Sequence, residues 1–217
     1  GMRTSAGITL HNEQQGSSAQ IDPDSDVPVK QQIEAVVGQA LAAAPDAVSF
    51  GVHFAPTEFT VTPDQETVQW IEWAGLHARA LRPGLPVFVN DHITGSQPTP
   101  SYDDRGCPPG TNAGGRGDYY DLAFHTDPSL GASVHTVMFY PLEGPARVYD
   151  QRSFAHKLCL MQVASAEGRD LQWFPEGSWW LSFDNTVPVW LQEGLARHEQ
   201  APGAPGEILP MERARGS

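Results

Sequence analysis

Side chains that can do acid–base or metal chemistry recur in this chain within or just after short apolar runs. Carboxylates serve as general acids, bases or nucleophiles, and imidazoles serve as bases or metal ligands. These positions are therefore the candidates for a reactive site. In chain order they are His53, Glu58, Asn90, Asp91, His92, His125, Asp127 and Glu176.

Glu176 has the most informative surroundings, because aromatic residues flank it on both sides. They are Trp173, Phe174, Trp179 and Trp180. If these rings also surround Glu176 in space, desolvation favours its protonated form, which a general acid needs. Asp91 and Asp127 are its candidate partners, since two carboxyl groups about 5–9.5 Å apart are needed to cleave a glycosidic bond.

These groups can meet only if the apolar runs are parallel strands, whose carboxyl ends share one edge of a sheet. Helical spacing of apolar residues predicts helices over 31–44, 62–81 and 151–168, with Thr62 as an N-terminal cap, and a short helix over 189–198. The strands are predicted over 7–11, 47–54, 86–90, 121–125, 134–140, 171–174 and 179–183. Alternation of helix and apolar strand is typical of β/α units.

The predicted fold is therefore α/β with a (β/α) barrel-like architecture. About six or seven strands and four helices fall short of the eight pairs of a full barrel, so a complete and a degenerate TIM barrel both stay open. The expected organisation is a mostly irregular arm over 1–27, a single β/α domain over 28–200 and a disordered tail over 201–217.

Composition narrows the class of partner. A net charge of −13 repels a phosphate backbone, so nucleic acid is not expected as a partner. No apolar run reaches the ~20 residues that span a bilayer, and no secretory signal follows Met2, which indicates a cytoplasmic protein unless a leader has been removed. Cys107 and Cys159 lack CxxC neighbours and are expected to be reduced thiols. Nothing indicates the oligomeric state.

The segment 175–184, together with Asn90-Asp91-His92 and 124–127, resembles the strand ends of TIM-barrel glycoside hydrolases. The resemblance implies a glycan or glycoside substrate and no cofactor. It implies that Glu176 is a catalytic acid or nucleophile with Asp91 or Asp127 as its partner. The substrate-binding residues would be Asn90, Glu58, His92, His125, Trp179 and Trp180.

Other classes of function stay open. His53, His92, His125 and Asp127 could hold Zn²⁺ or another divalent metal in a hydrolase. The spacing of His125 and Asp127 also fits an iron facial triad, with His156 or His198 as the distal ligand. A third class is a carbohydrate-binding barrel without catalysis.

Overall fold

The computed structural model describes residues 4–10, 20–55, 62–91, 99–108, 117, 119–135 and 154–174. The strand predicted over 179–183, the helix over 189–198 and the tail over 201–217 lie outside these residues. Within them the elements are β1 (Ser5–Thr9), α1 (Val29–Ala43), β2 (Ser49–Ala55), α2 (Asp64–Leu81), β3 (Val87–Asp91), the 3-10 helix η1 (Tyr119–His125), β4 (Gly131–His135), α3 (Phe154–Ala166) and β5 (Leu171–Phe174).

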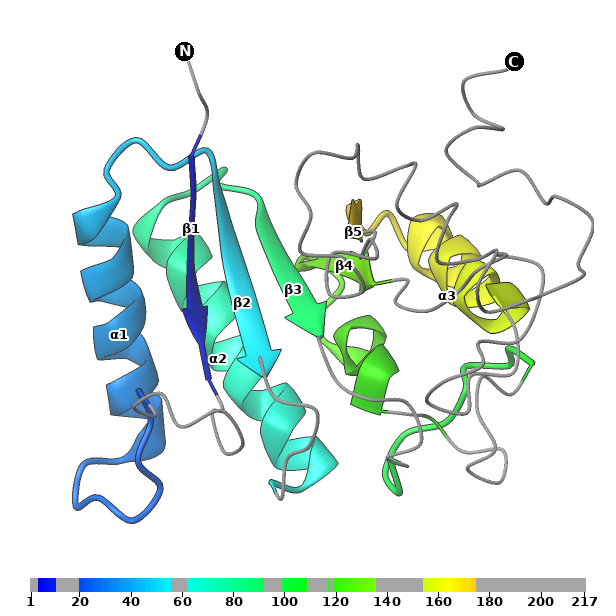
Figure 1. Cartoon of the computed structure of the whole chain (residues 1–217), viewed down its shortest axis with the longest axis horizontal. Helices are drawn as coiled ribbons and strands as arrows, with labels where there is room; N and C mark the ends of the chain where they lie inside the picture. The colour runs from blue at the N-terminus through cyan, green and yellow to red at the C-terminus, as the bar shows by residue number, and fades with distance from the viewer. Residues whose placement is uncertain are drawn as a thin grey trace, which may run out of the picture.

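The strands form one parallel sheet in the order β1-β2-β3-β4-β5, so the predicted α/β class and parallel sheet are confirmed. The arrowheads of β1, β2 and β3 lie side by side and point the same way (Figure 1). Each strand pairs with the next one along the chain. The order therefore lacks the reversal at which a doubly wound sheet places its ligand.

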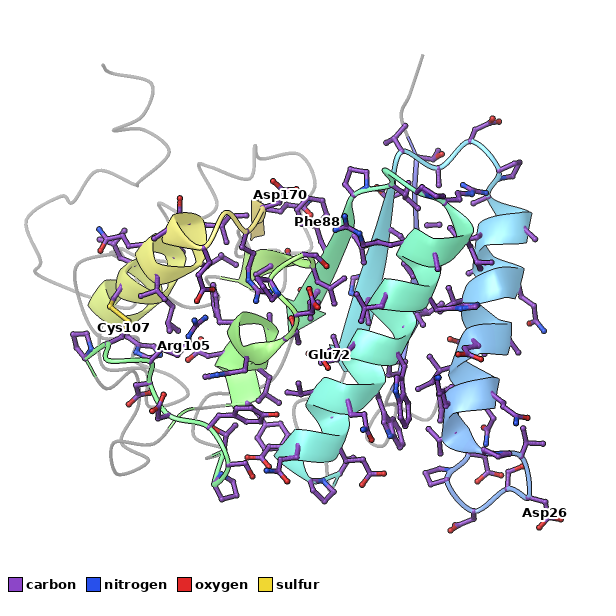
Figure 2. The ribbon with its side chains drawn as sticks, turned by 180° about the vertical axis from the view of Figure 1, so that it is seen from behind. Asp26, Glu72, Phe88, Arg105, Cys107 and Asp170 are labelled. Atoms are coloured by element: carbon purple, nitrogen blue, oxygen red, sulfur yellow. A yellow bond between two sulfur atoms is a disulfide. The ribbon has the colours of Figure 1, made fainter. Side chains whose placement is uncertain are left out.

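One face of the sheet is apolar and carries the helices. Its strand residues, which are Ile8, Phe50, Val52, Val87, Val89, Ala132 and Val134, are all buried. They pack in one cluster with Ile33 and Val37 of α1 and with Ile71 of α2. Figure 2 shows α2 lying across this face. Right-handed crossovers between neighbouring parallel strands put the helices on one side, which leaves the second face of the sheet to other side chains.

Two local predictions are wrong. The segment 121–125, predicted as a strand, belongs to η1. Leu122, Ala123 and Phe124 are buried one after another, whereas a half-buried strand alternates. At α2, Thr62 does not cap the helix, because the N-cap is Pro63 and makes no side-chain hydrogen bond.

The expectation of two reduced thiols is also wrong, because Cys107 and Cys159 form a disulfide with their Cα atoms 5.7 Å apart. The two residues are 52 positions apart in sequence, and only the packing of α3 beside the segment 99–108 brings them together. Among the helices of the described ranges, none is long and apolar enough to cross a membrane.

Candidate functional site

A row of polar side chains crosses the face of the sheet opposite the helices, one from each strand. The strand pairings align them in the order Thr9, His53, Asn90, Ser133 and Gln172. Residues in register on parallel strands project to the same face, so the row presents hydroxyl, imidazole and amide groups together. It lies toward the carboxyl ends of the strands, where parallel β/α proteins place their sites.

The row lines a pocket of about 440 Å³. Small residues nearer the amino ends of the strands complete it, among them Ser5, Gly7, Ser49 and Gly51, together with the ring of Phe88. Among the described residues, this lining contains no Asp, Glu, Lys or Arg. The pocket therefore offers hydroxyl, carboxamide and imidazole groups beside the ring of Phe88.

Two glycines make room for the rings in this face. A Cβ atom at Gly51 would lie 3.0 Å from Nε2 of His53, so the imidazole lies over the glycine of its own strand. A Cβ atom at Gly131 would lie 2.6 Å from Cδ1 of Phe88, so that ring covers the neighbouring strand β4. Side chains at either position would displace a ring that shapes the pocket.

Asn90 carries an unsatisfied acceptor in this pocket. Its Oδ1 atom is buried and has no hydrogen-bond partner among the residues that the structure describes. A buried polar atom without a partner costs about 1–3 kcal/mol, and such atoms in native proteins call for an explanation.

Of the predicted site residues, His53 and Asn90 are brought together, because they are paired in register on β2 and β3. Asp91 ends β3 directly after Asn90. The other predicted residues of this cleft lie outside the described ranges. They are Glu58, His92, Glu176, Trp179 and Trp180.

His125 lies elsewhere, on η1. Its ring packs on Tyr102 with centroids 4.7 Å apart and planes tilted by 34°. It lines a different pocket, of about 460 Å³, with Pro100, Ser101 and Asp103. Burial lowers the pKa of His125, although the nearby carboxylate of Asp121 opposes this shift. His125 is thus a largely desolvated, neutral imidazole outside the sheet pocket.

Asp127 closes a turn ahead of β4 and does not follow a strand. The backbone N–H of Ser129 donates to its Oδ1 at 2.8 Å, and its own N–H donates to Oε1 of Glu72 at 2.9 Å. Hydrogen bonds from the side chain and backbone of Ser129 lower the pKa of Asp127. Glu72 points from α2 toward η1 (Figure 2). These contacts give Asp127 a structural role, because they stabilise the turn that leads into β4.

The described members of the predicted metal sets do not converge. Within the described part of the chain, no three His, Cys, Asp or Glu side chains are grouped closely enough to hold a metal ion. His53, His125 and Asp127 therefore form no centre by themselves. His156, considered for an iron site, is buried and bonds instead to Oδ2 of Asp121 at 2.7 Å and to the carbonyl of Pro108 at 2.6 Å.

Comparison of the chain with protein-family models, with curated proteins and with solved structures finds no match. The pocket itself indicates its chemistry. Hydroxyls and carboxamides both donate and accept hydrogen bonds, and an imidazole offers two ring nitrogens to a ligand. Such a lining suits a ligand that carries several hydroxyl groups.

Thr9, Ser133 and Gln172 were not predicted as site residues. The signal for them is the alternation along each strand, as in Ser5-Gly7-Thr9 and Ser49-Gly51-His53, where every second residue is small or polar. A strand buried on both faces would be apolar throughout. The alternation thus marks one face of the sheet as polar.

Proposed function

We propose that this chain is a carbohydrate-active protein that binds a glycan or glycoside on the polar face of its sheet and hydrolyses it. The observation that carries the proposal is the row of five hydrogen-bonding side chains, one from each parallel strand, that lines a single pocket. A sugar ring matches this lining, because it presents hydroxyl groups around its rim and C–H groups on its faces. Phe88 offers an apolar surface for such a face.

The proposed architecture is a (β/α) barrel, complete or partial. Sequential strand order with the helices on one side is the arrangement that repeated β/α units produce when they curve toward closure. In that architecture the polar face becomes the interior, and the loops after the strands form the active end. The position of the pocket row, near the carboxyl ends of β2 and β3, supports this proposal.

Hydrolysis would require carboxyl groups in addition to the described lining. Glu176 remains the proposed acid or nucleophile and Asp91 its proposed partner, because Asp91 ends β3 at the carboxyl edge of the sheet, where parallel β/α proteins place their sites. Asp127 is less suited as the partner, since its oxygen and its N–H are engaged in the turn before β4.

The test is a panel of aryl glycosides and oligosaccharides, with binding and turnover measured separately. We expect Glu176→Gln and Asp91→Asn to lower turnover by about 100-fold or more while binding is retained. Asp127→Asn is the matched control and should leave turnover within a few-fold. Binding by the wild type without any turnover would identify a non-catalytic carbohydrate-binding protein, and loss of turnover on treatment with a chelator would favour the metal-dependent hydrolase. Absence of binding to every sugar would refute the proposal.

An oxidising compartment is part of the proposal. Disulfides persist mainly in secreted, periplasmic or luminal proteins, and the Cys107–Cys159 bond supports such a location over the cytoplasm. Thiol trapping in cells that express the chain, with and without export, tests this point. Modification of both cysteines by the trapping reagent in the exported protein, to the same extent as without export, would contradict it.

A further inference from the structure

We propose that His156 and Asp121 form a pH-dependent latch, which holds Pro108 against α3 while both ring nitrogens of His156 carry protons. The latch lies on the side of the molecule that contains η1, α3 and the disulfide, and the proposal is independent of sugar binding. It gives the segment 99–108 a second, reversible attachment to α3 beside the disulfide.

Both ring nitrogens of His156 face oxygen atoms. Nδ1 lies 2.6 Å from the carbonyl oxygen of Pro108, and Nε2 lies 2.7 Å from Oδ2 of Asp121. A carbonyl oxygen only accepts hydrogen bonds, so Nδ1 must carry a proton for this contact to be favourable. Nε2 and the carboxyl group then share a further proton. An imidazolium beside a carboxylate and a neutral imidazole beside a carboxylic acid contain the same number of protons, so both descriptions give the same result.

Burial of the pair favours retention of the shared proton. The side chains of His156 and Asp121 are only 2% and 4% exposed. Burial by itself favours a neutral imidazole, but the pair as a whole is neutral with the proton and carries a net negative charge without it. A net charge at a buried position costs more than a neutral pair. A free imidazole loses its proton near pH 6.5, so we expect the folded pair to keep the shared proton to higher pH.

Loss of this proton should release Pro108 rather than Asp121. A neutral imidazole has one N–H for two acceptors, and a carboxylate is a stronger acceptor than a backbone carbonyl. The remaining N–H would therefore stay with Asp121 on the Nε2 side. The lone pair of Nδ1 would then face the carbonyl oxygen of Pro108, which is an unfavourable contact, and the latch would open there.

Among the described side chains, the other charged or titratable groups of the elements around the latch keep a constant charge above pH 6.5. They are Asp103, Asp104, Arg105, His125, Glu167 and Arg169. Carboxylates are ionised and guanidinium groups protonated in this range, and burial lowers the pKa of His125, which keeps that ring neutral. The folded chain therefore binds more protons than the unfolded chain above pH 6.5 because of the latch. The stability that the latch contributes is fully present below this pH and is lost as the pH rises further.

The first measurement is NMR of the ring nitrogens in protein labelled with ¹⁵N-histidine. At about pH 7.5, where a free imidazole is mostly neutral, both ring nitrogens of His156 should be protonated in the folded wild type. Asp121→Asn removes the carboxylate, so one ring nitrogen should be unprotonated at the same pH. Asp127→Asn is the matched control, because that carboxylate belongs to the turn before β4, and it should leave His156 doubly protonated.

The second measurement is tryptic cleavage after Arg105, followed by mass spectrometry of the reduced products and normalised at each pH to cleavage of a short peptide. Cleavage of the wild type should accelerate severalfold over the pH range in which His156 loses its proton, because the segment 99–108 opens more often when Pro108 is released. Three results would overturn the proposal, and the wild type alone gives each of them. They are an unprotonated ring nitrogen of His156 at about pH 7.5, a normalised cleavage rate that stays level while the ring loses its proton, and retention of both protons until the chain unfolds.

Discussion

The Cys107–Cys159 disulfide ties the segment 99–108 to α3, and its removal gives a prediction with a calculable magnitude. Cross-linking two residues 52 positions apart lowers the entropy of the unfolded chain. The loop-closure relation gives about 4 kcal/mol for a loop of this length at 25 °C. We therefore expect Cys107→Ser combined with Cys159→Ser to lower the free energy of unfolding by roughly this amount.

Other contacts hold the same segment in place, so the folded state should survive the change. The carbonyl of Pro108 bonds to the ring of His156 at 2.6 Å, and Arg105 donates to the carbonyl of Phe124 at 2.7 Å. Arg105 and Cys107 lie beside α3 in Figure 2. The cost should thus appear mainly as a lower melting temperature, with the native circular dichroism spectrum retained below it.

The assay compares melting temperatures of the oxidised wild type, the reduced wild type and the double serine variant. For a chain of 150–250 residues, about 4 kcal/mol corresponds to a fall of roughly 8–16 °C. The reduced wild type should match the variant, and reductant should not change the variant further. The reasoning would be refuted by a variant that melts within about 1 °C of the oxidised wild type, or by two titratable thiols in oxidised, folded protein.

Three further predictions concern single side chains. Gly131→Ala should lower the free energy of unfolding by about 1–3 kcal/mol, because its Cβ would lie 2.6 Å from the ring of Phe88. Gly38→Ala, where a Cβ would meet no atom within 4 Å, should raise it slightly. Equal melting temperatures of the two variants would contradict this prediction. The pKa of His125 is lowered in the folded protein, so the unfolded chain binds more protons just below pH 6.5. The free energy of unfolding should therefore fall as the pH drops through this range, and it should fall less in His125→Phe. Equal pH dependence in the wild type and the variant would contradict this prediction. Arg169→Met should lower the free energy of unfolding, measured by chemical denaturation, by about 3 kcal/mol or more, because it leaves the carbonyls of Ala123, Thr126 and Leu130 without their donor. A decrease below about 1 kcal/mol would contradict this prediction.

Elements with a clear hydrophobic period were predictable from sequence. Helices were expected over 31–44 and 62–81, and α1 and α2 occupy 29–43 and 64–81. The strands expected over 47–54 and 86–90 correspond to β2 and β3. Each of these elements buries one face or one stripe, and that burial imposes the period of its backbone on the sequence.

The segment 119–130 was not predictable in this way, because long-range contacts decide its conformation. The guanidinium group of Arg169, which lies 39 residues beyond Leu130 in sequence, donates to the carbonyls of Ala123, Thr126 and Leu130. The His156–Asp121 contact and the disulfide likewise join α3 to segments that are distant in sequence. A short stretch of sequence does not indicate which distant residues will contact it.

For the candidate site, the sequence alone determined the class of fold and the strand ends that carry His53 and Asn90, because alternation and charge pattern are local properties. The tertiary structure alone decided which groups share a pocket. Strand register placed Thr9, Ser133 and Gln172 beside these two residues, while the helical turn of η1 took His125 to a different pocket. The physical reason is that a one-residue change of register reverses every side chain of a strand, and hydrogen bonds between strands settle that register only when the sheet forms.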